Sequence, residues 1–172
     1  MAALQEDESA IFLFDFAAAF PSVSQDFLLR ALAHIGLPAG ALKAVRALYD
    51  NNRCRLAFGG QLWGGFLREG GIRQGCPLSP ILFAAVMDPF LQLLRRRLPG
   101  ELIRAYADDT AAVVRNVREA TPILTHEFRR LAAVANLVLN IPKTVCIPLW
   151  PTTMEHLRSM LVSVDALSLI HI

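Results

Sequence analysis

The sequence has little charge and no long hydrophobic run. Its 172 residues are 54% hydrophobic but only 19% charged, and the formal net charge is +2. Apolar runs such as Ile11–Phe14 and Ile81–Met87 are far shorter than the roughly 20 residues that a membrane-spanning helix needs. Disorder is excluded as well, because it requires low hydrophobicity together with high net charge. The apolar content therefore predicts the core of one globular domain and no membrane partner.

The sequence also lacks a disulfide framework and a zinc-binding pattern. Its three cysteines, Cys54, Cys76 and Cys146, are widely spaced and odd in number, which favours a reducing, intracellular compartment. Residues 1–15 carry four acids and no base, whereas a signal peptide begins with a basic segment. Nucleus and cytoplasm both stay open as locations.

The spacing of apolar residues predicts alternating strands and helices. Ser22 with Gln25 has the spacing of a capping box and predicts a helix from about Val23, and Ser79 followed by Pro80 predicts a second helix start. Turn residues predict one hairpin around Gly59-Gly60 and another around Asp108-Asp109. We expect strands at 10–16, 53–58, 61–68, 101–106, 110–115 and 143–149, and helices at 23–35, 39–50, 79–97 and 118–135.

Positive charge is concentrated in one part of the chain. Residues 43–73 carry six basic residues against Asp50 and Glu69, a local charge of 6 − 2 = +4. Such a band indicates a polyanionic partner, although a solvated rim of arginines explains the charge equally well. The basic residues are Lys43, Arg46, Arg53, Arg55, Arg68 and Arg73.

Acidic residues stand at the ends of predicted core strands. Asp15 follows the run Phe-Leu-Phe, and Asp108 and Asp109 lie between two apolar strands. Taken singly, each acid is compatible with an ordinary strand-end or turn residue. If the strands are neighbours, however, three carboxylates converge and repel unless a cation lies between them. Mg²⁺ prefers carboxylate oxygens, and two such ions would suit nucleotidyl transfer.

Four motifs in order show a family resemblance. They are Phe14–Phe20, Gly71–Pro80, Ala105–Asp109 and Leu139–Thr144. With them, residues 10–150 resemble the palm of a reverse transcriptase of the non-LTR retrotransposon or group II intron type. The combination of Arg-Gln-Gly-Cys-Pro-Leu-Ser-Pro with Tyr-Ala-Asp-Asp is highly specific.

The resemblance implies a metal site and a proton donor. Asp15 and Asp108 would be the principal ligands of two Mg²⁺ ions, for which Mn²⁺ could substitute, and the backbone carbonyl of Phe16 would help. Asp109 would be the third, less essential acid. Lys143 would be a general acid for the departing pyrophosphate, and its alternative is a solvated lysine at the start of a strand.

The resemblance also implies how the substrates bind. Phe20 would lie under the incoming sugar, where its ring would clash with a 2′-hydroxyl and favour deoxynucleotides. Gln74 and Gly75 would contact template or nucleotide, Arg73 a phosphate, and Tyr106 the primer end. The implied partners are an RNA template, a DNA primer, a dNTP, and the fingers and thumb regions of a longer protein.

The resemblance implies an α+β fold, a polymerase palm with an antiparallel sheet and helices packed mainly on one face. We expect residues 1–151 to form a partial palm with its fingers largely missing, and residues 152–172 an incomplete C-terminal segment, of which 167–172 resemble a sequencing artefact. An exposed apolar patch is expected where fingers and thumb would lie. The function implied is RNA-directed DNA synthesis. The alternatives are an inactive retroelement remnant and another palm-type nucleotidyl transferase, such as a nucleotide cyclase.

Overall fold

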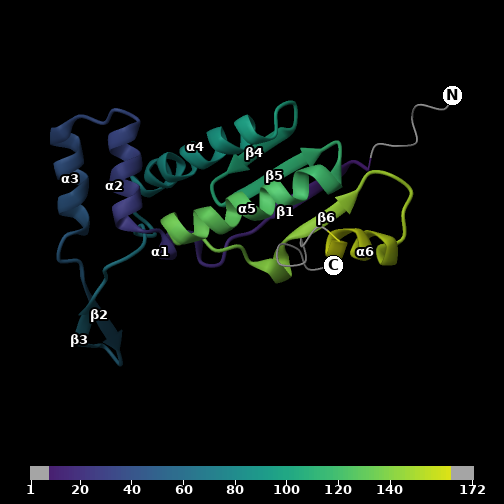
Figure 1. Cartoon of the computed structure of the whole chain (residues 1–172). Coiled ribbons are helices and arrows are strands. Elements are labelled where there is room, and N and C mark those ends of the chain that lie inside the picture. The colour runs from purple at the N-terminus through teal and green to yellow at the C-terminus, as the bar shows by residue number, and fades with distance from the viewer. Residues whose placement is uncertain (1–7, 164–172) are drawn as a thin grey trace.

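A four-stranded antiparallel sheet forms the centre of the molecule, whose computed structural model describes residues 8–163. The strands are β1 (Ala10–Phe14), β4 (Leu102–Tyr106), β5 (Asp109–Val114) and β6 (Val145–Pro148), in the order β4-β5-β1-β6. β1 pairs with β5 on one side and with β6 on the other. The first strand in the sequence is therefore an inner strand of the sheet (Figure 1).

The two faces of the sheet differ in burial. Phe12 and Phe14 of β1 and Ala112 of β5 are buried, whereas Leu13, between the two phenylalanines, is 42% exposed. This alternation follows from the period of two in a strand, and it separates a core face from an open face. The open face carries the exposed apolar side chains Leu13, Leu102, Val145 and Ile147, in agreement with the expected exposed patch.

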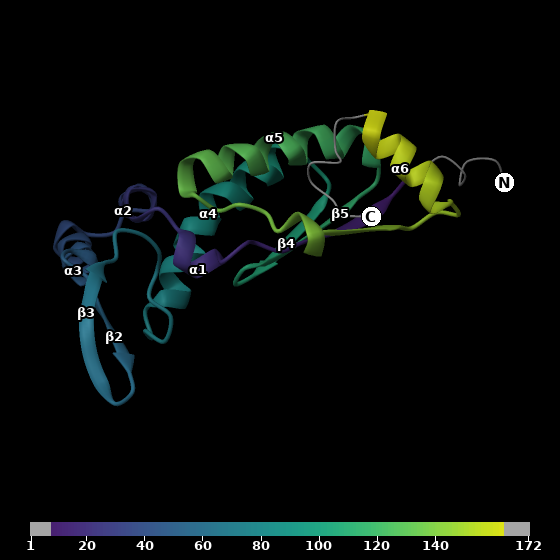
Figure 2. The ribbon, with the colours of Figure 1, turned by 90° about the horizontal axis from the view of Figure 1, so that it is seen from below.

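Two long helices, α4 (Ser79–Arg97) and α5 (Val117–Ala135), cover the core face of the sheet (Figure 2). Phe128 of α5 joins the layers, because its ring lies 4.4 Å from that of Phe14 in β1 and 4.9 Å from that of Phe90 in α4. The expected α+β architecture with helices on one face is thus confirmed. Within residues 8–163, no helix is long and apolar enough to cross a membrane.

The segment between β1 and α4 forms a second, smaller group of elements. It contains α1 (Ala19–Ser22), α2 (Gln25–His34), α3 (Ala39–Tyr49), β2 (Arg53–Phe58) and β3 (Gln61–Leu67). α2 packs against α4 and α3. The β2–β3 hairpin extends away from the sheet and helices (Figure 2).

Several element boundaries differ from the sequence-based predictions. Ser22 lies inside α1, and it is Ser24 that caps α2 by accepting a hydrogen bond from the Phe27 amide at 3.3 Å. Ser79 is the first residue of α4 rather than its cap, and its hydroxyl donates to the Arg73 carbonyl. A 3₁₀ turn, Ile141–Lys143, delays the start of β6.

The chain after the last strand holds an element that the sequence did not predict, α6 (Met154–Ser163), which packs against α5. The expected artefact at 167–172 lies outside the described residues.

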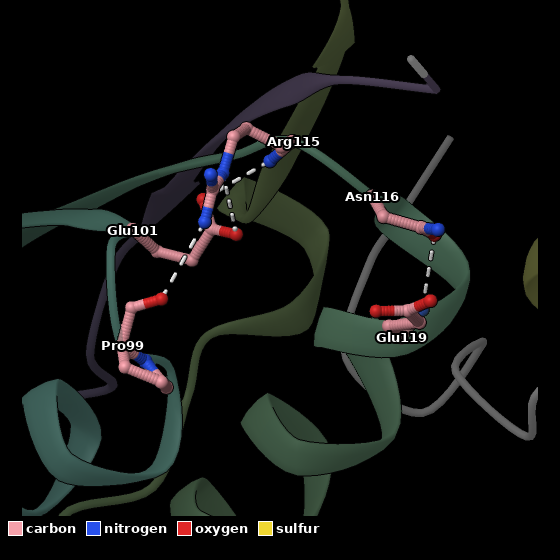
Figure 3. Close-up of polar contacts among 5 residues, drawn as sticks. All are labelled: Pro99, Glu101, Arg115, Asn116 and Glu119. Atoms are coloured by element: carbon pink, nitrogen blue, oxygen red, sulfur yellow. Dashed lines mark hydrogen bonds and ion pairs between the residues drawn. The ribbon is translucent and has the colours of Figure 1, made fainter. Parts of the chain in front are cut away.

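A polar cluster ties the far end of the β4–β5 pair to the start of α5 (Figure 3). The Arg115 backbone amide and guanidinium both donate to the Glu101 carboxylate, at 3.1 and 3.4 Å. The next residue, Asn116, caps α5 by accepting from the Glu119 amide at 3.2 Å. The turn from β5 into the helix is thereby held by side chains as well as by backbone.

We expect Asn116→Ala to lower the free energy of unfolding by about 1 kcal/mol, because the first turn of α5 loses its capping acceptor. Urea denaturation followed by circular dichroism measures the change. Asn116→Ser is the matched control, since serine can accept the same bond and should retain most of the stability. Equal losses in the two variants would contradict the capping role.

Candidate active site

The β1–β5 pairing brings the three candidate acids to one end of the sheet. Phe14 is opposite Thr110 in the register, so Asp15, one residue beyond, lies beside the β4–β5 turn. Phe14 and Thr110 are both buried, and alternation therefore places Asp15 and Asp109 towards the open face. Asp108 occupies the turn itself and is half-buried.

The turn that carries Asp108 is a two-residue hairpin. Tyr106 pairs with Asp109, which leaves Ala107 and Asp108 as the two turn residues. Ala107 has a φ of 52°, and a positive φ at the first turn residue alone is the pattern of a type II′ hairpin. The tight turn holds Asp108 and Asp109 at the tip of the strand pair.

The Asp15 side chain has a basic neighbour but an incompletely bonded carboxylate. Lys143 Nζ lies 3.7 Å from Asp15 Oδ2, and Oδ2 itself is buried without a hydrogen-bond partner. The backbone brings Lys143 here, because the Asn140 amide donates to the Asp15 carbonyl at 2.8 Å just before the 3₁₀ turn. A buried, unpartnered carboxylate oxygen is costly and is the type of atom that a cation would satisfy.

The backbone carbonyl of Phe16 is oriented towards the end of the sheet at which the three acids lie. Phe16 forms an isolated antiparallel bridge with Leu139, and the bonds of that bridge come from the flanking residues, with the Ala17 amide donating to the Val138 carbonyl at 2.8 Å. In such a pair the central residue directs its own amide and carbonyl away from the partner segment. The Phe16 carbonyl therefore points to the side of the strand on which the β4–β5 hairpin lies.

The donors at this end of the sheet fit a hard divalent cation. The carboxylates of Asp15, Asp108 and Asp109 and the carbonyl of Phe16 are all oxygen ligands, as Mg²⁺ prefers. Oδ2 of Asp15 has no hydrogen-bond partner, so its lone pairs are free to coordinate a cation. Among residues 8–163, however, no three acidic, histidine or cysteine side chains lie close enough together to hold a metal ion. The strand ends converge as expected, but the three carboxylates do not form one compact group in this structure.

Three of the predicted substrate-binding residues line one pocket of the structure. This pocket, with a volume of about 410 Å³, is lined by Phe20, Gln74 and Gly75 together with Cys76, Pro77, Ser79 and Pro80. The Phe20 ring is stacked on Phe83 of α4 at 4.5 Å and 21°. The core phenylalanine Phe83 thus supports the ring that faces the pocket.

The loop that carries Gln74 is fixed to α1 by backbone hydrogen bonds. The Gly71 amide donates to the Val23 carbonyl at 2.8 Å, and the Ile72 amide donates to the Phe20 carbonyl at 2.7 Å. The Gln25 side chain adds a bond to the Gly71 carbonyl at 3.2 Å. The loop and Phe20 are consequently held as one unit.

Arg73 makes structural contacts in place of lining this pocket. Its guanidinium donates to Asn52 Oδ1 at 3.0 Å and to the Leu48 carbonyl, and it lies over the Tyr49 ring at 5.9 Å. These bonds connect the loop to the end of α3. The contact of Arg73 with a phosphate stays a prediction, whereas its role as a connection between two elements is visible in the fold.

Tyr106 and an arginine that the sequence-based interpretation missed flank the acids. Tyr106 is 85% exposed and lines a pocket of about 370 Å³ with Asp109, Arg104, Leu13 and others. Ile103 is buried, so Arg104 shares the open face with Tyr106. The alternation of residues 102–106 could have identified Arg104 from the sequence.

The cysteines show no sign of nucleophilic chemistry. All three are free thiols, as expected from the absence of a disulfide framework. Burial raises the pKa of the Cys146 thiol to about 12, so this group stays protonated at neutral pH. Cys76 lines the pocket beside Gly75.

Comparison with solved structures identifies the fold. Apo telomerase from Candida tropicalis, truncated from its C-terminal domain, aligns with a TM-score of 0.70 at 17% identity, over 84% of this chain and 31% of that one. Telomerase from Candida albicans in complex with the TWJ fragment of telomeric RNA aligns with a TM-score of 0.66 at 13% identity, over 85% and 28% of the two chains. The class is thus an α+β fold shared with part of telomerase.

Comparison of sequences identifies the family. The model described as "Reverse transcriptase (RNA-dependent DNA polymerase)" matches residues 1–157, and the chain belongs to that family. The Pol polyprotein of retrotransposable element R2DM from Drosophila melanogaster is 29% identical over 135 residues, which are 75% of this chain and 13% of that protein. The uncharacterized 149 kDa protein of transposon TX1 from Xenopus laevis is 30% identical over 112 residues, 60% and 9% of the two lengths. The resemblance to non-LTR retrotransposon proteins is confirmed, and the chain spans only a small part of these relatives.

We expect Gly71→Ala to destabilise the protein more than Gly75→Ala. Both glycines have a positive φ, 79° and 82°, which costs an alanine about 1–2 kcal/mol. A Cβ on Gly71 would also lie 2.2 Å from the Pro21 carbonyl oxygen, whereas a Cβ on Gly75 would have no atom within 4 Å. The difference in unfolding free energy between the variants, measured in urea, should be at least about 1 kcal/mol. Equal stabilities would contradict the close approach of the loop to α1.

Proposed function

We propose that this chain is the catalytic part of an RNA-directed DNA polymerase, which adds deoxynucleotides to a primer 3′-hydroxyl. The observation that carries the proposal is the buried Asp15 Oδ2, which has no hydrogen-bond partner, lies beside the Asp108-Asp109 turn and forms an ion pair with Lys143 at 3.7 Å. Family membership supports it. The activity of the whole protein, its template and its primer belong to the same proposal.

The acids would act by holding two metal ions in position at the reacting groups. Two Mg²⁺ ions, when bound, lower the pKa of the primer hydroxyl and stabilise the negative charge on the leaving oxygen. Asp15 and Asp108 would hold them, assisted by the Phe16 carbonyl and, less essentially, by Asp109. The β1–β5 pairing would hold the backbone of these residues at one end of the sheet, so that only their side chains need to move when cations bind.

Lys143 would assist the departure of pyrophosphate. The primer hydroxyl would lose its proton to solvent and its oxygen would form a bond to the α-phosphorus while the bond from that phosphorus to the bridging oxygen breaks, and the Lys143 ammonium would donate a proton to the departing oxygen. The ion pair with Asp15 keeps the ammonium at the same end of the sheet. Its positive charge would also offset the developing negative charge.

The pocket of Phe20, Gln74 and Gly75 would receive the incoming nucleotide and its template base. The Phe20 ring, supported by Phe83, would exclude a 2′-hydroxyl. Gly75 has no Cβ, which leaves the backbone accessible to a base, and Gln74 is an exposed hydrogen-bonding side chain. Tyr106, exposed beside the acids, would contact the primer end.

We expect Asp15→Asn and Asp108→Ala each to lower the rate of primer extension at least about a hundredfold, because each removes a group that holds transition-state charge. The assay uses an RNA template, a DNA primer, dNTPs and Mg²⁺. Asp88→Asn is the control, because the Asp88 carboxylate accepts a hydrogen bond from Gln92 of the same helix, α4, and this variant should retain the activity. Extension that survives Asp108→Ala would contradict the site, and an inactive unmodified chain would favour the alternative of a piece without catalysis.

We expect Phe20→Val to raise the incorporation of ribonucleotides relative to deoxynucleotides by about tenfold or more, since a smaller side chain removes the clash with the 2′-hydroxyl. The ratio of kcat/KM for the two nucleotides measures the effect. Phe27→Val is the matched control, because Phe27 is half-buried in α2 and does not line the pocket. An unchanged ratio in Phe20→Val would contradict the assignment of Phe20 to the sugar.

A further inference from the structure

The β2–β3 hairpin leaves almost all of its side chains in solvent. Every residue of the two strands is exposed except the half-buried Cys54, and the strands pack mainly against each other. Figures 1 and 2 both show the hairpin projecting beyond α3, away from the sheet. An isolated hairpin is only marginally stable in water, so these faces are suited to a partner.

One face of the hairpin is aromatic. Cys54 pairs with Phe66 and Leu56 with Trp63, which places their side chains on the same face, and Phe58 follows at the next alternate position. The exposed fractions are 79% for Phe58, 54% for Trp63 and 57% for Phe66. Three large rings in solvent on one short ribbon are far more than a solvated hairpin requires.

A glycine bulge keeps these rings on one face. The register shifts between Cys54 and Leu56, so that Gly64 and Gly65 together lie opposite one residue of β2. A Cβ on Gly65 would lie 1.5 Å from the Cys54 carbonyl oxygen, which only glycine avoids. In a regular strand without the bulge, the spacing of three residues would place Trp63 and Phe66 on opposite faces.

The same part of the chain carries cations that have no acidic partner among residues 8–163. The guanidinium groups of Arg68 and Arg73 in the basic band donate to backbone carbonyls, whereas no ion pair or hydrogen bond joins the side chains of the band's other four residues to the described residues. Neither β2 nor β3 contains an acid. The four are Lys43 and Arg46 on α3 and Arg53 and Arg55 on β2.

We propose that α3 and the β2–β3 hairpin, residues 39–67, form an arm that binds single-stranded nucleic acid. Bases stack on Phe58, Trp63 and Phe66, and phosphates meet the four cations. The two strands lie about 4.8 Å apart, so arginines on the opposite face of this narrow ribbon extend past its edge. Stacking requires unpaired bases. This surface is separate from Asp15 and its neighbours, and its binding does not depend on polymerase activity.

A protein-binding face is less consistent with these observations. It would explain the exposed rings. It would not explain why four cations without an ion pair to the described residues lie on the same elements, α3 and β2, or why neither of these elements nor β3 contains an acid. Exposed aromatic rings close to arginines are the combination that binds single-stranded nucleic acid. The positive charge therefore favours nucleic acid over protein as the partner of this surface.

Trp63 provides a direct test. The chain has two tryptophans, Trp63 and Trp150, so Trp150→Phe leaves Trp63 as the reporter. Titration of this variant with a single-stranded RNA of about 20 nucleotides should quench Trp63 emission at the same concentration that raises the anisotropy of the labelled RNA. A blunt duplex of the same sequence should quench it much less. RNA binding without quenching, or equal quenching by the duplex, would overturn the stacking contact.

Matched variants distinguish the contribution of the arginines to RNA binding from the contribution of the aromatic rings. R53A/R55A should weaken RNA binding about tenfold at low salt and reduce the slope of log K against log [salt] by about 1.4, since each single-strand phosphate contact contributes about 0.7. R95A/R96A removes the same charge from two exposed arginines on α4 and should leave both quantities nearly unchanged. W63A/F66A should weaken binding about tenfold without changing the slope.

Three further results would overturn the proposal. One is an equal loss of RNA affinity in R53A/R55A and R95A/R96A, and another is an unmodified chain that binds no RNA. The third is a dimer, measured by sedimentation, that W63A/F66A dissociates while RNA affinity stays unchanged, because the aromatic face would then bind a second copy. Circular dichroism and urea unfolding verify that each variant is folded, which is expected because the changed side chains are exposed.

Discussion

The pairing of β1 with β5 is the constraint on which the rest of the candidate site depends. Its register, Phe14 opposite Thr110, is what places Asp15 beside the Asp108-Asp109 turn. A slip of one residue would exchange the faces of the strand, so that Asp15 would enter the aromatic core and Phe14 would face solvent. The burial of Phe12 and Phe14 against the helices therefore determines where the acid lies.

The site combines a rigid sheet with a loop held by the helices. α4 and α5 bury one face of the sheet, with Phe128 in contact with both layers, and this leaves the open face to the acids. The loop before α4 is bonded to α1 through the Gly71 and Ile72 amides. Because α1 directly follows β1, the acids and the Phe20 pocket are held by one short stretch of chain, which suits a reaction that depends on positioning.

Element types were predictable and helix starts were not. Strong periodicity identified the sheet strands and the four longer helices, but Ser22 and Ser24 are both acceptable helix caps. The choice between them depends on α5, because the Asn136 side chain donates to the Ser22 carbonyl at 2.8 Å and the Ser24 amide donates to the Ala135 carbonyl at 2.8 Å. α6 was missed because the apolar pattern weakens after Pro151, and its packing against α5 stabilises it.

The sequence by itself determined which residue types could carry chemistry, since carboxylates at strand ends and a glycine-rich loop are local features. It also determined the family, through motifs in a specific order. Only the tertiary structure decided which side chains meet. It placed Lys143 beside Asp15, put Arg104 beside Asp109, connected Arg73 to α3, and gave the side chains of the four cations of the arm no ion pair within residues 8–163. These contacts depend on strand order and helix packing, which join segments distant in the chain and which no local pattern specifies.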